Sequence, residues 1–270
     1  MYQDLVSINI TTFNRANLLS RCLDSVLKQT YKNIEIIIVD DASSDKTGDV
    51  VKSYQAEHSN IKYFSHSLNQ GNAEARNTAF KKCKGTYVAF MDDDDEWIDA
   101  DKISKQVKIF NQADKNLGIV CSGIIRHLED GSEVTENMLE ISNVQSRILK
   151  GGWIHNSTVL TKRSILNDLN GFNTEIPRGV DYEFFIRVIA KYNFKVFFMQ
   201  DITCKYYENS PNRMTDKRNT IEAISTANFV QVFILKKYFK YYIKSPSALL
   251  NRLLVILKIK IKLLILRISS

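Results

Sequence analysis

The chain is poor in residues that break or crosslink structure. Its 270 residues include only ten Gly and three Pro, which argues against a disordered or fibrous protein. The four cysteines lie far apart without a Cys-x-x-Cys pair, so neither a zinc site nor a disulfide framework is indicated. No basic segment precedes the first apolar run, so we expect no secretory signal and a reducing cytoplasm.

Positive charge is scarce in most of the chain and concentrated at its end. The formal net charge is +7, yet residues 219–270 hold nine Lys or Arg against one acid, Glu222. That segment therefore carries +8, whereas the first 218 residues hold 28 basic and 29 acidic residues. With 44% apolar residues the chain can bury a full core. We expect a near-neutral globular domain over 1–215 and a basic tail over 216–270.

Hydrophobic patterning in the first hundred residues alternates between strand and helix. Strands are predicted at 5–12, 34–39, 61–64 and 87–91, and helices at 18–27, 47–57 and 72–82. Asn14 is the candidate cap of the first helix. The alternation indicates an α/β fold with a mostly parallel central sheet flanked by helices. Ligands of such sheets bind beyond the carboxyl ends of the strands.

The later part of the domain is less regular. A helix is predicted at 101–111, strands at 119–125 and 194–199, and a hairpin turn at Asp130-Gly131. Asp181 precedes apolar residues at helical spacing, which predicts a further helix there.

Four adjacent carboxylates, Asp92 to Asp95, follow the predicted strand at 87–91. Their mutual repulsion disfavours folding unless a cation lies among them. Carboxylate oxygens suit Mg²⁺ or Mn²⁺, which commonly bind one or two carboxylates together with phosphate oxygens. The alternative is a solvated acidic loop. The preceding buried strand favours the metal site.

Several motifs occur together in a characteristic order. They are Val6 to Arg15, Ser25 to Tyr31, Ile38 to Asp45, Ala75-Arg76-Asn77, the Asp-x-Asp-Asp of Asp92 to Asp95, and Gly171-Phe172. Over roughly residues 4–200 the chain resembles the inverting, A-fold nucleotide-sugar glycosyltransferases of family 2. The resemblance implies a nucleotide-binding part at 1–100 and an acceptor part at 101–215.

The resemblance also implies roles for individual residues. The residues that it places at the nucleotide are Thr11, Asn14, Arg15, Asp41, Arg76, Asp92 and Asp93. Asp41 can accept the imide N–H of uracil, and Arg76 lies near the diphosphate. Asp94 is the expected metal ligand, assisted by Asp92, although four identical residues leave the register open by one position. The alternatives are a strand-end cap for Asp41 and a surface arginine for Arg76.

Inverting transfer needs a base that deprotonates the acceptor hydroxyl. In the family this base is the acid of a Glu-Asp pair that begins a helix late in the domain. Here Val180 replaces the Glu, so Asp181 is the expected base and Glu183 the reserve; an N-cap is the alternative for Asp181.

The positions that the resemblance assigns to the acceptor are Trp153, His155, Asn156 and Asp95. The alternatives are a core tryptophan for Trp153 and a structural histidine for His155.

The tail combines basic and apolar residues. In 229–244 four lysines fall within one arc of about 100° on a helical wheel, as in a helix at a membrane interface. Residues 249–268 are long enough to span a bilayer, but Lys258, Lys260 and Lys262 near the middle argue against a spanning helix. We expect 229–268 to contact an anionic membrane surface. Packing of the tail on the catalytic domain is the alternative.

Together these features predict a metal-dependent inverting glycosyltransferase that uses a UDP-sugar. The resemblance and the tail suggest a polyprenyl-diphosphate-linked saccharide acceptor in O-antigen or capsule synthesis, at the cytoplasmic face of the plasma membrane. A sugar-phosphate nucleotidyltransferase is the nearest rival, but residues 11–15 contain no glycine-rich phosphate loop. A non-catalytic membrane scaffold is the other alternative. Nucleic-acid binding is disfavoured because the positive charge is confined to an aliphatic tail.

Overall fold

The structure is a computed structural model that describes residues 4–137, 143–151, 154–208 and 220–268. The described strands are β1 (Val6–Thr12), β2 (Ile34–Asp40), β3 (Ile61–Ser65), β4 (Tyr87–Asp92), β5 (Glu96–Trp97), β6 (Leu117–His127), β7 (Glu133–Glu136), β8 (Leu160–Lys162) and β9 (Lys195–Tyr207). The described α-helices are α1 (Ala16–Leu27), α2 (Thr47–Glu57), α3 (Asn72–Lys82), α4 (Lys102–Gln112), α5 (Val144–Lys150), α6 (Arg163–Asp168), α7 (Val180–Ile186), α8 (Ile221–Lys237), α9 (Phe239–Ile243) and α10 (Pro246–Ile268). A 3₁₀ turn, η1, covers Asn156–Thr158, and a π-helical segment, η2, covers Arg187–Lys191.

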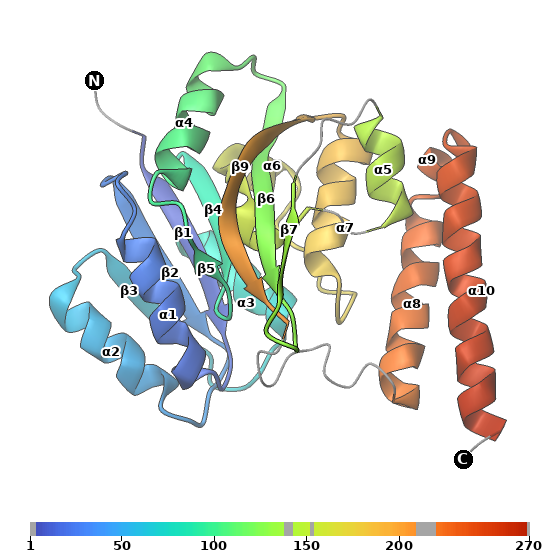
Figure 1. The fold of residues 1–270 in the computed structure, drawn as a ribbon, viewed down its shortest axis with the longest axis horizontal. Helices are drawn as coiled ribbons and strands as arrows, with labels where there is room; N and C mark the ends of the chain where they lie inside the picture. Colours follow the sequence, from blue (N-terminus) through green and yellow to red (C-terminus); the bar gives the residue numbers. More distant parts are fainter. Residues whose placement is uncertain (1–3, 138–142, 152–153, 209–219, 269–270) are drawn as a thin grey trace. The chain divides into compact units, whose positions relative to one another are not determined.

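A nine-stranded sheet organises the first part of the chain (Figure 1). Its order is β3-β2-β1-β4-β8-β6-β9-β5, with β7 paired to β6. Strands β3, β2, β1 and β4 are parallel, and β8 is antiparallel to both β4 and β6. The predicted α/β fold with a central sheet is therefore confirmed; the sheet is parallel over β3, β2, β1 and β4 and mixed beyond them.

The sheet forms because its central strands are apolar on both faces. Ile36 to Val39 of β2 are completely buried, as expected for a β-branched run covered on both sides. Helix α1 buries Leu19, Leu23 and Val26, which recur at helical spacing, in the same core. Helices α1 and α2 pack against each other on this part of the sheet (Figure 1).

The strand register brings distant polar residues to one edge. Thr11 of β1 pairs with Asp92 of β4, and Thr12 pairs with Asp40 of β2. All three strands are parallel, so their carboxyl ends meet at the same edge of the sheet. The predicted approach of residues about eighty positions apart is confirmed for Thr11 and Asp92.

Two compact units divide the chain. The first comprises residues 1–140, 154–172 and 194–210 and contains the sheet. The second comprises residues 141–153, 173–193 and 211–270, and its helices α8 and α10 run side by side (Figure 1). The second unit does not begin at the predicted boundary, since it joins residues 211–270 to two earlier segments, 141–153 and 173–193. The predicted boundary between 215 and 216 stays a prediction.

Two local expectations need correction. Asn14 does not cap α1: the N-cap residue is Arg15, without a side-chain cap, and Asn14 Oδ1 accepts a 2.8 Å bond from the Ser44 backbone instead. The backbone of Asn14 has a positive φ of 53°, which Asn tolerates better than most residues and which orients it toward that loop. The predicted helix over 229–244 is interrupted at Tyr238, between α8 and α9.

The last segment, whose conformation the sequence left open, is the continuous helix α10, which begins with Pro246 at its first position. Among the described helices, none combines the length and apolarity that crossing a membrane requires.

Candidate active site

The acidic run follows directly from a buried strand. Asp92 is the last residue of β4, and the chain then turns, with the Asp95 N–H donating a 3.1 Å bond to the Asp92 carbonyl. The side chain of Asp92 is 33% exposed, whereas Asp93, Asp94 and Asp95 are buried. The run is thus an ordered part of the sheet edge, which excludes a freely solvated acidic loop.

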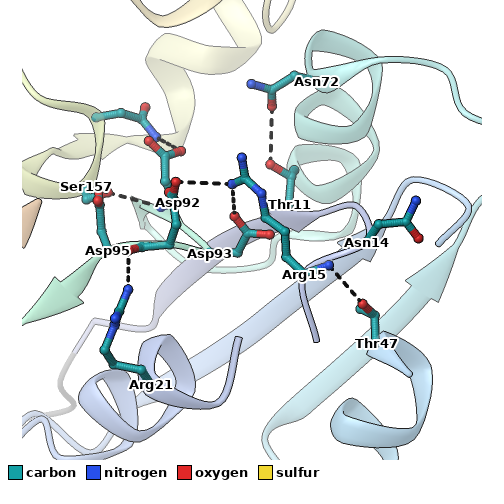
Figure 2. Close-up of polar contacts among 12 residues, drawn as sticks. Thr11, Asn14, Arg15, Arg21, Thr47, Asn72, Asp92, Asp93, Asp95 and Ser157 are labelled. Carbon is teal, nitrogen blue, oxygen red and sulfur yellow. Dashed lines mark hydrogen bonds and ion pairs between the residues drawn. The ribbon is translucent and has the colours of Figure 1, made fainter. Parts of the chain in front are cut away.

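Two arginines from other segments balance these carboxylates. Arg15 Nη1 lies 2.6 Å from Asp93 Oδ1 and 3.3 Å from Asp94 Oδ2. Arg76 Nη2, from α3, donates a 2.8 Å bond to Asp92 Oδ1. Figure 2 shows Arg15 and Asp93 pointing toward one another beside the end of β1. The structure therefore brings together Arg15, Arg76 and the acidic run, as the predicted nucleotide site requires.

A 3₁₀ turn far along the chain supports the same carboxylates. Asn156 Nδ2 donates a 2.8 Å bond to Asp92 Oδ1. Ser157 Oγ donates a 2.5 Å bond to Asp95 Oδ2, and Figure 2 shows Ser157 beside Asp92 and Asp95. Ser157 Oγ also accepts a 3.1 Å bond from the Asp92 N–H. Sequence reasoning missed Ser157, because nothing in its neighbourhood marks it as different from an ordinary turn serine.

A further arginine fixes the backbone of the run. Arg21 of α1 donates a 2.7 Å bond to the Asp94 carbonyl, and its guanidinium carbon lies 3.6 Å from the centroid of the Tyr207 ring. The sequence analysis did not single out Arg21. Its position on the helix after β1 is the signal that could have found it, since that helix begins at the edge where the strands end.

The donor set fits a hard divalent cation. Asp94 and the partly exposed Asp92 offer carboxylate oxygens, which Mg²⁺ and Mn²⁺ prefer. Burial raises the pKa of Asp93 to about 6, against the opposing effect of the Arg15 guanidinium, so negative charge there is costly without a cation. No group of three or more acidic, His or Cys side chains among the described residues is arranged as a complete metal site. Phosphate oxygens or water would supply the further ligands.

Asp41 is held firmly at the end of β2. Its Oδ1 lies 2.7 Å from His66 Nδ1 and accepts a 2.8 Å bond from the Gln70 N–H, and its Oδ2 accepts a 2.7 Å bond from the Gly71 N–H. These contacts occupy three of roughly four acceptor positions of a carboxylate. The second nitrogen of His66 lies 3.0 Å from Thr78 Oγ1. His66 was missed by the sequence analysis, which had no spacing rule to connect it to Asp41.

The other predicted nucleotide residues lie near the same edge. Thr11 Oγ1 donates a 3.3 Å bond to Asn72 Oδ1, at the start of α3. The Asn14 N–H donates to Ser43 Oγ at 2.8 Å, so Asn14 is tied to the loop after β2 (Figure 2 shows its side chain). The loop after β1 is therefore tied to the loop after β2, and the end of β1 is tied to the start of α3.

The predicted acceptor residues are only partly described. His155 Nε2 lies 3.2 Å from Glu136 Oε2, and its ring centroid lies 5.8 Å from that of Tyr206. Trp153 lies outside the described residues. Asp95 is buried, and its Oδ2 accepts the bond from Ser157.

Asp181 and Glu183 belong to the second unit, in the first turn of α7. Gly179, with a positive φ of 68°, is the residue before this helix, so Asp181 is not its N-cap. Glu183 is fully buried; it accepts a 2.9 Å bond from Arg187 Nε and a second bond from the Tyr238 hydroxyl. Asp181 is partly exposed, and no side-chain hydrogen bond or ion pair joins it to another described residue. Of the two acids, Asp181 is the one left accessible.

Fold and site together define an A-fold sugar-transferring class. The sequence model of "Glycosyl transferase family 2" matches residues 7–174. The chain is also 32% identical over 202 residues to the Escherichia coli protein WfgD, named UDP-Glc:alpha-D-GlcNAc-diphosphoundecaprenol beta-1,3-glucosyltransferase, covering 75% of this chain and 76% of WfgD. The chain belongs to glycosyltransferase family 2.

Other relatives match only in part. An uncharacterized glycosyltransferase of Rickettsia felis is 33% identical over 200 residues, which cover 70% of this chain and 32% of that protein. The chain thus spans about a third of the length of that relative, and 24% of the length of the Streptococcus pneumoniae glycosyltransferase GlyA.

Solved structures show the same fold. Staphylococcus aureus TarS in complex with UDP-GlcNAc has a TM-score of 0.69 at 20% identity, covering 86% of this chain and 66% of that one. The mannosyltransferase PcManGT from Pyrobaculum calidifontis, in complex with GDP-Man and Mn²⁺, has a TM-score of 0.65 at 21% identity, covering 93% of this chain and 74% of that one. These likenesses confirm the predicted A fold.

Proposed function

We propose that the chain is a metal-dependent, inverting hexosyltransferase. It transfers a sugar from a UDP-sugar to a hydroxyl of a polyprenyl-diphosphate-linked saccharide, in the synthesis of a surface polysaccharide such as O-antigen or capsule. WfgD supports the choice of donor and acceptor, because its name states UDP-Glc and a diphosphoundecaprenol-linked GlcNAc. The observation that carries the proposal is the acidic run, which follows β4 at the edge where β1 and β2 end and is balanced by Arg15 and Arg76.

The nucleotide is proposed to bind along that edge. Asp41 keeps one acceptor position for the uracil imide, since its contacts occupy only three of about four. Arg76 Nη1 is buried without a hydrogen-bond partner among the described residues, which favours an added acceptor such as a diphosphate oxygen. Asp94 and Asp92 would hold Mn²⁺ or Mg²⁺, which when bound neutralises charge on the leaving diphosphate. Thr11, Asn14, Arg15 and Asp93 complete the proposed nucleotide site.

Asp181 is the proposed base, and Glu183 is not needed as a reserve. A general base must be open to the acceptor hydroxyl, so the partly exposed carboxylate of Asp181 is the better candidate of the two acids. Glu183 is buried and already accepts bonds from Arg187 and Tyr238. Trp153, His155 and Asn156 remain the proposed acceptor-side residues, and Asp95, which is buried and bonded to Ser157, is proposed to hold the acidic run in place instead.

The first experiment is a calorimetric titration with UDP and GDP, each with and without Mn²⁺. We expect UDP to bind preferentially and to need the metal, and we expect Asp94→Ala to weaken metal-dependent binding about tenfold or more. Asp114→Ala is the matched control, since Asp114 is exposed and precedes β6, whose amino end lies at the opposite edge of the sheet. If neither nucleotide binds with metal present, the enzymatic proposal is wrong and the chain is better explained as a non-catalytic scaffold. Binding of UDP by Asp94→Ala as tightly as by wild type would overturn the metal assignment.

We further propose that the tail binds the inner face of the plasma membrane, through α10. One stripe of this helix is apolar yet 47–77% exposed; it consists of Leu250, Leu253, Leu254, Leu257, Ile261, Leu264, Ile265 and Ile268. At 100° per residue these side chains share an arc of about 120°. Lys258 and Lys262 flank this arc on one side, and Lys260 and Arg267 on the other.

This arrangement suits a helix lying in an anionic membrane interface. Apolar side chains enter the lipid, and flanking cations reach the head groups, each contributing about 1 kcal/mol. The lysines that alternate in sequence therefore need not share a face. Helix α10 contains no acidic residue that would pair with the cations of a second copy across the stripe.

Vesicle flotation tests the membrane surface. We expect the protein to float with vesicles containing phosphatidylglycerol and not with pure phosphatidylcholine. Lys258→Gln with Lys262→Gln should weaken binding about tenfold or more, whereas the exposed lysines Lys28 and Lys115, changed to Gln together, should have little effect. Equal flotation of both double variants contradicts the proposal. Self-association that Leu257→Gln abolishes, without lipid binding, would assign the stripe to a second copy instead.

A further inference from the structure

The helix that carries Asp181 is short and anchored on both sides of its first turn. Helix α7 has seven residues and continues into the π-helical segment η2, a geometry that is frequent at functional sites. Tyr182 and Glu183, which follow Asp181 directly, point about 100° apart around the helix axis. Each of them is held by a residue from the C-terminal helices of the same unit.

Tyr238 holds Glu183. Tyr238 is the residue between α8 and α9, is buried, and donates its hydroxyl to Glu183 Oε1. Burial, and then the Glu183 carboxylate, raise the pKa of Tyr238 well above its usual range, so the phenol remains a donor. Arg187 occupies the other oxygen of Glu183 at 2.9 Å. Two hydrogen-bond donors, one on each carboxylate oxygen, fix the orientation of the Glu183 side chain.

Arg252 holds Tyr182. The Arg252 side chain, from α10, donates to the Tyr182 hydroxyl, to Tyr242 Oη at 2.9 Å and to the Leu149 carbonyl at 2.9 Å. Tyr182 in turn donates to the Leu149 carbonyl at 3.2 Å. Arg252 is 2% exposed, and no described residue offers it a carboxylate partner.

A buried cation among neutral oxygens is an expensive arrangement. Apolar residues of similar volume would often stabilise such a site at least as well. A planar guanidinium contributes fixed geometry, because its N–H donors hold several acceptor groups in defined positions at once. Here the acceptors come from α5, α7 and α9, so Arg252 sets the position of α7 relative to its neighbours within the unit.

We infer that Tyr238 and Arg252 are positioning residues for the base: they act through Glu183 and Tyr182 to orient the first turn of α7 and hence the Asp181 carboxylate. The C-terminal helices are then part of the acceptor machinery as well as a membrane surface. This inference rests on the proposed role of Asp181.

Kinetics of Tyr238→Phe test the inference, with UDP-glucose as donor and GlcNAc diphosphate on a short lipid chain as acceptor. We expect kcat to fall about tenfold, because a small misplacement of a catalytic group is costly. The KM for the donor should stay within about twofold, since the proposed nucleotide contacts belong to the first unit. Tyr241→Phe is the matched control, because no described residue accepts a hydrogen bond from that hydroxyl. Arg252→Lys, which keeps the charge but loses the fork, should lower kcat by a smaller factor.

The Asp181→Asn background separates the possible outcomes. Asp181→Asn alone should lower kcat by about 10²-fold or more, and adding Tyr238→Phe should then have no further effect. Unchanged activity of Asp181→Asn would refute Asp181 as the base, and with it the proposal that Tyr238 and Arg252 position the base. A large loss in Asp181→Asn with the same tenfold effect of Tyr238→Phe in both backgrounds would refute the positioning role alone. Hydrogen exchange gives a readout that needs no acceptor: Tyr238→Phe, and not Tyr241→Phe, should speed exchange of the α7 amides.

Discussion

Two arginines of this chain lie in contrasting surroundings. Arg15, in the first unit, contacts two carboxylates, Asp93 at 2.6 Å and Asp94 at 3.3 Å, and its side chain is 15% exposed. Arg252, in the second unit, contacts two phenol oxygens and one carbonyl and is almost fully buried. The first cluster carries charge of both signs at a sheet edge, and the second carries a single charge in a closed interior.

The difference indicates that the first cluster is suited to ligand binding and the second to structural stabilisation. Charged groups of both signs at a sheet edge are able to contact a metal ion and phosphates, because carboxylates suit the cation and guanidinium groups suit the phosphates. The neutral oxygens around Arg252 have no such alternative, and removal of the cation leaves a cavity and lost hydrogen bonds. We therefore expect changes in the first cluster to alter ligand affinity and changes in the second to alter stability and the orientation of α7.

The largest effect should come from Arg252→Ala. Loss of three buried hydrogen bonds and of the packing against Tyr182 and Tyr242 should lower the free energy of unfolding by about 3 kcal/mol. Denaturant titration followed by tryptophan fluorescence measures it, with the exposed Arg267→Ala as control. The UDP affinity of the folded protein should not change, whereas Arg15→Ala should weaken UDP binding. If Arg252→Ala lowers UDP affinity as much as Arg15→Ala does, the separation of the two clusters is wrong.

A smaller effect concerns Lys102, a fully buried basic residue of the first unit. Its Nζ lies 4.2 Å from the Trp97 ring centroid and donates a 2.9 Å bond to Gln106 Oε1. Burial lowers the pKa of Lys102 to about 7, below its unfolded value of about 10.4. Between these values the unfolded chain binds more protons than the folded chain, so the contribution of Lys102 to stability rises with pH.

Comparison with Lys102→Met isolates this contribution. From pH 7 to pH 9 the wild type should gain about 2 kcal/mol of unfolding free energy relative to the variant. At pH 7 the variant should be the more stable protein, because it buries no charge. Denaturant titrations at the two pH values test the difference. A constant difference between the proteins would mean that Lys102 keeps its ordinary pKa and that its surroundings solvate the charge.

Much of the first unit could be predicted from sequence because its signals are local. The β-branched run of β2 and the apolar spacing of α1 each predict their element within a residue or two of the observed ends. Asn14 was misassigned because a loop contact with Ser44 replaces the cap, and that contact depends on tertiary structure. The register of the acidic run could not be fixed, since four identical side chains differ only in exposure and partner.

The second unit was harder to predict because its signals are non-local. The break at Tyr238 follows no Gly or Pro, and the hydroxyl of Tyr238 bonds Glu183 at a separation of 55 residues. Arg252 looks like one of several tail cations until the fold shows it buried beside Tyr182, 70 residues earlier. Periodicity predicts faces of helices, but it cannot say which basic residue of a helix points inward.

The smallest predicted effect is at His66, which supports the proposed uracil contact without being part of the acidic run. His66→Ala removes the 2.7 Å contact to Asp41 Oδ1 and should weaken UDP binding about threefold to tenfold, with less discrimination against CDP. His66→Asn, whose amide can replace Nδ1 as donor, should restore most of the affinity. His58→Ala is the control, since His58 lies at the end of α2 and stacks only on Tyr54 among the described aromatic contacts. If His66→Ala weakens UDP and CDP equally, then Asp41 holds the loop at 66–71 rather than the base, and the first unit would resemble the second in using a buried charge for positioning.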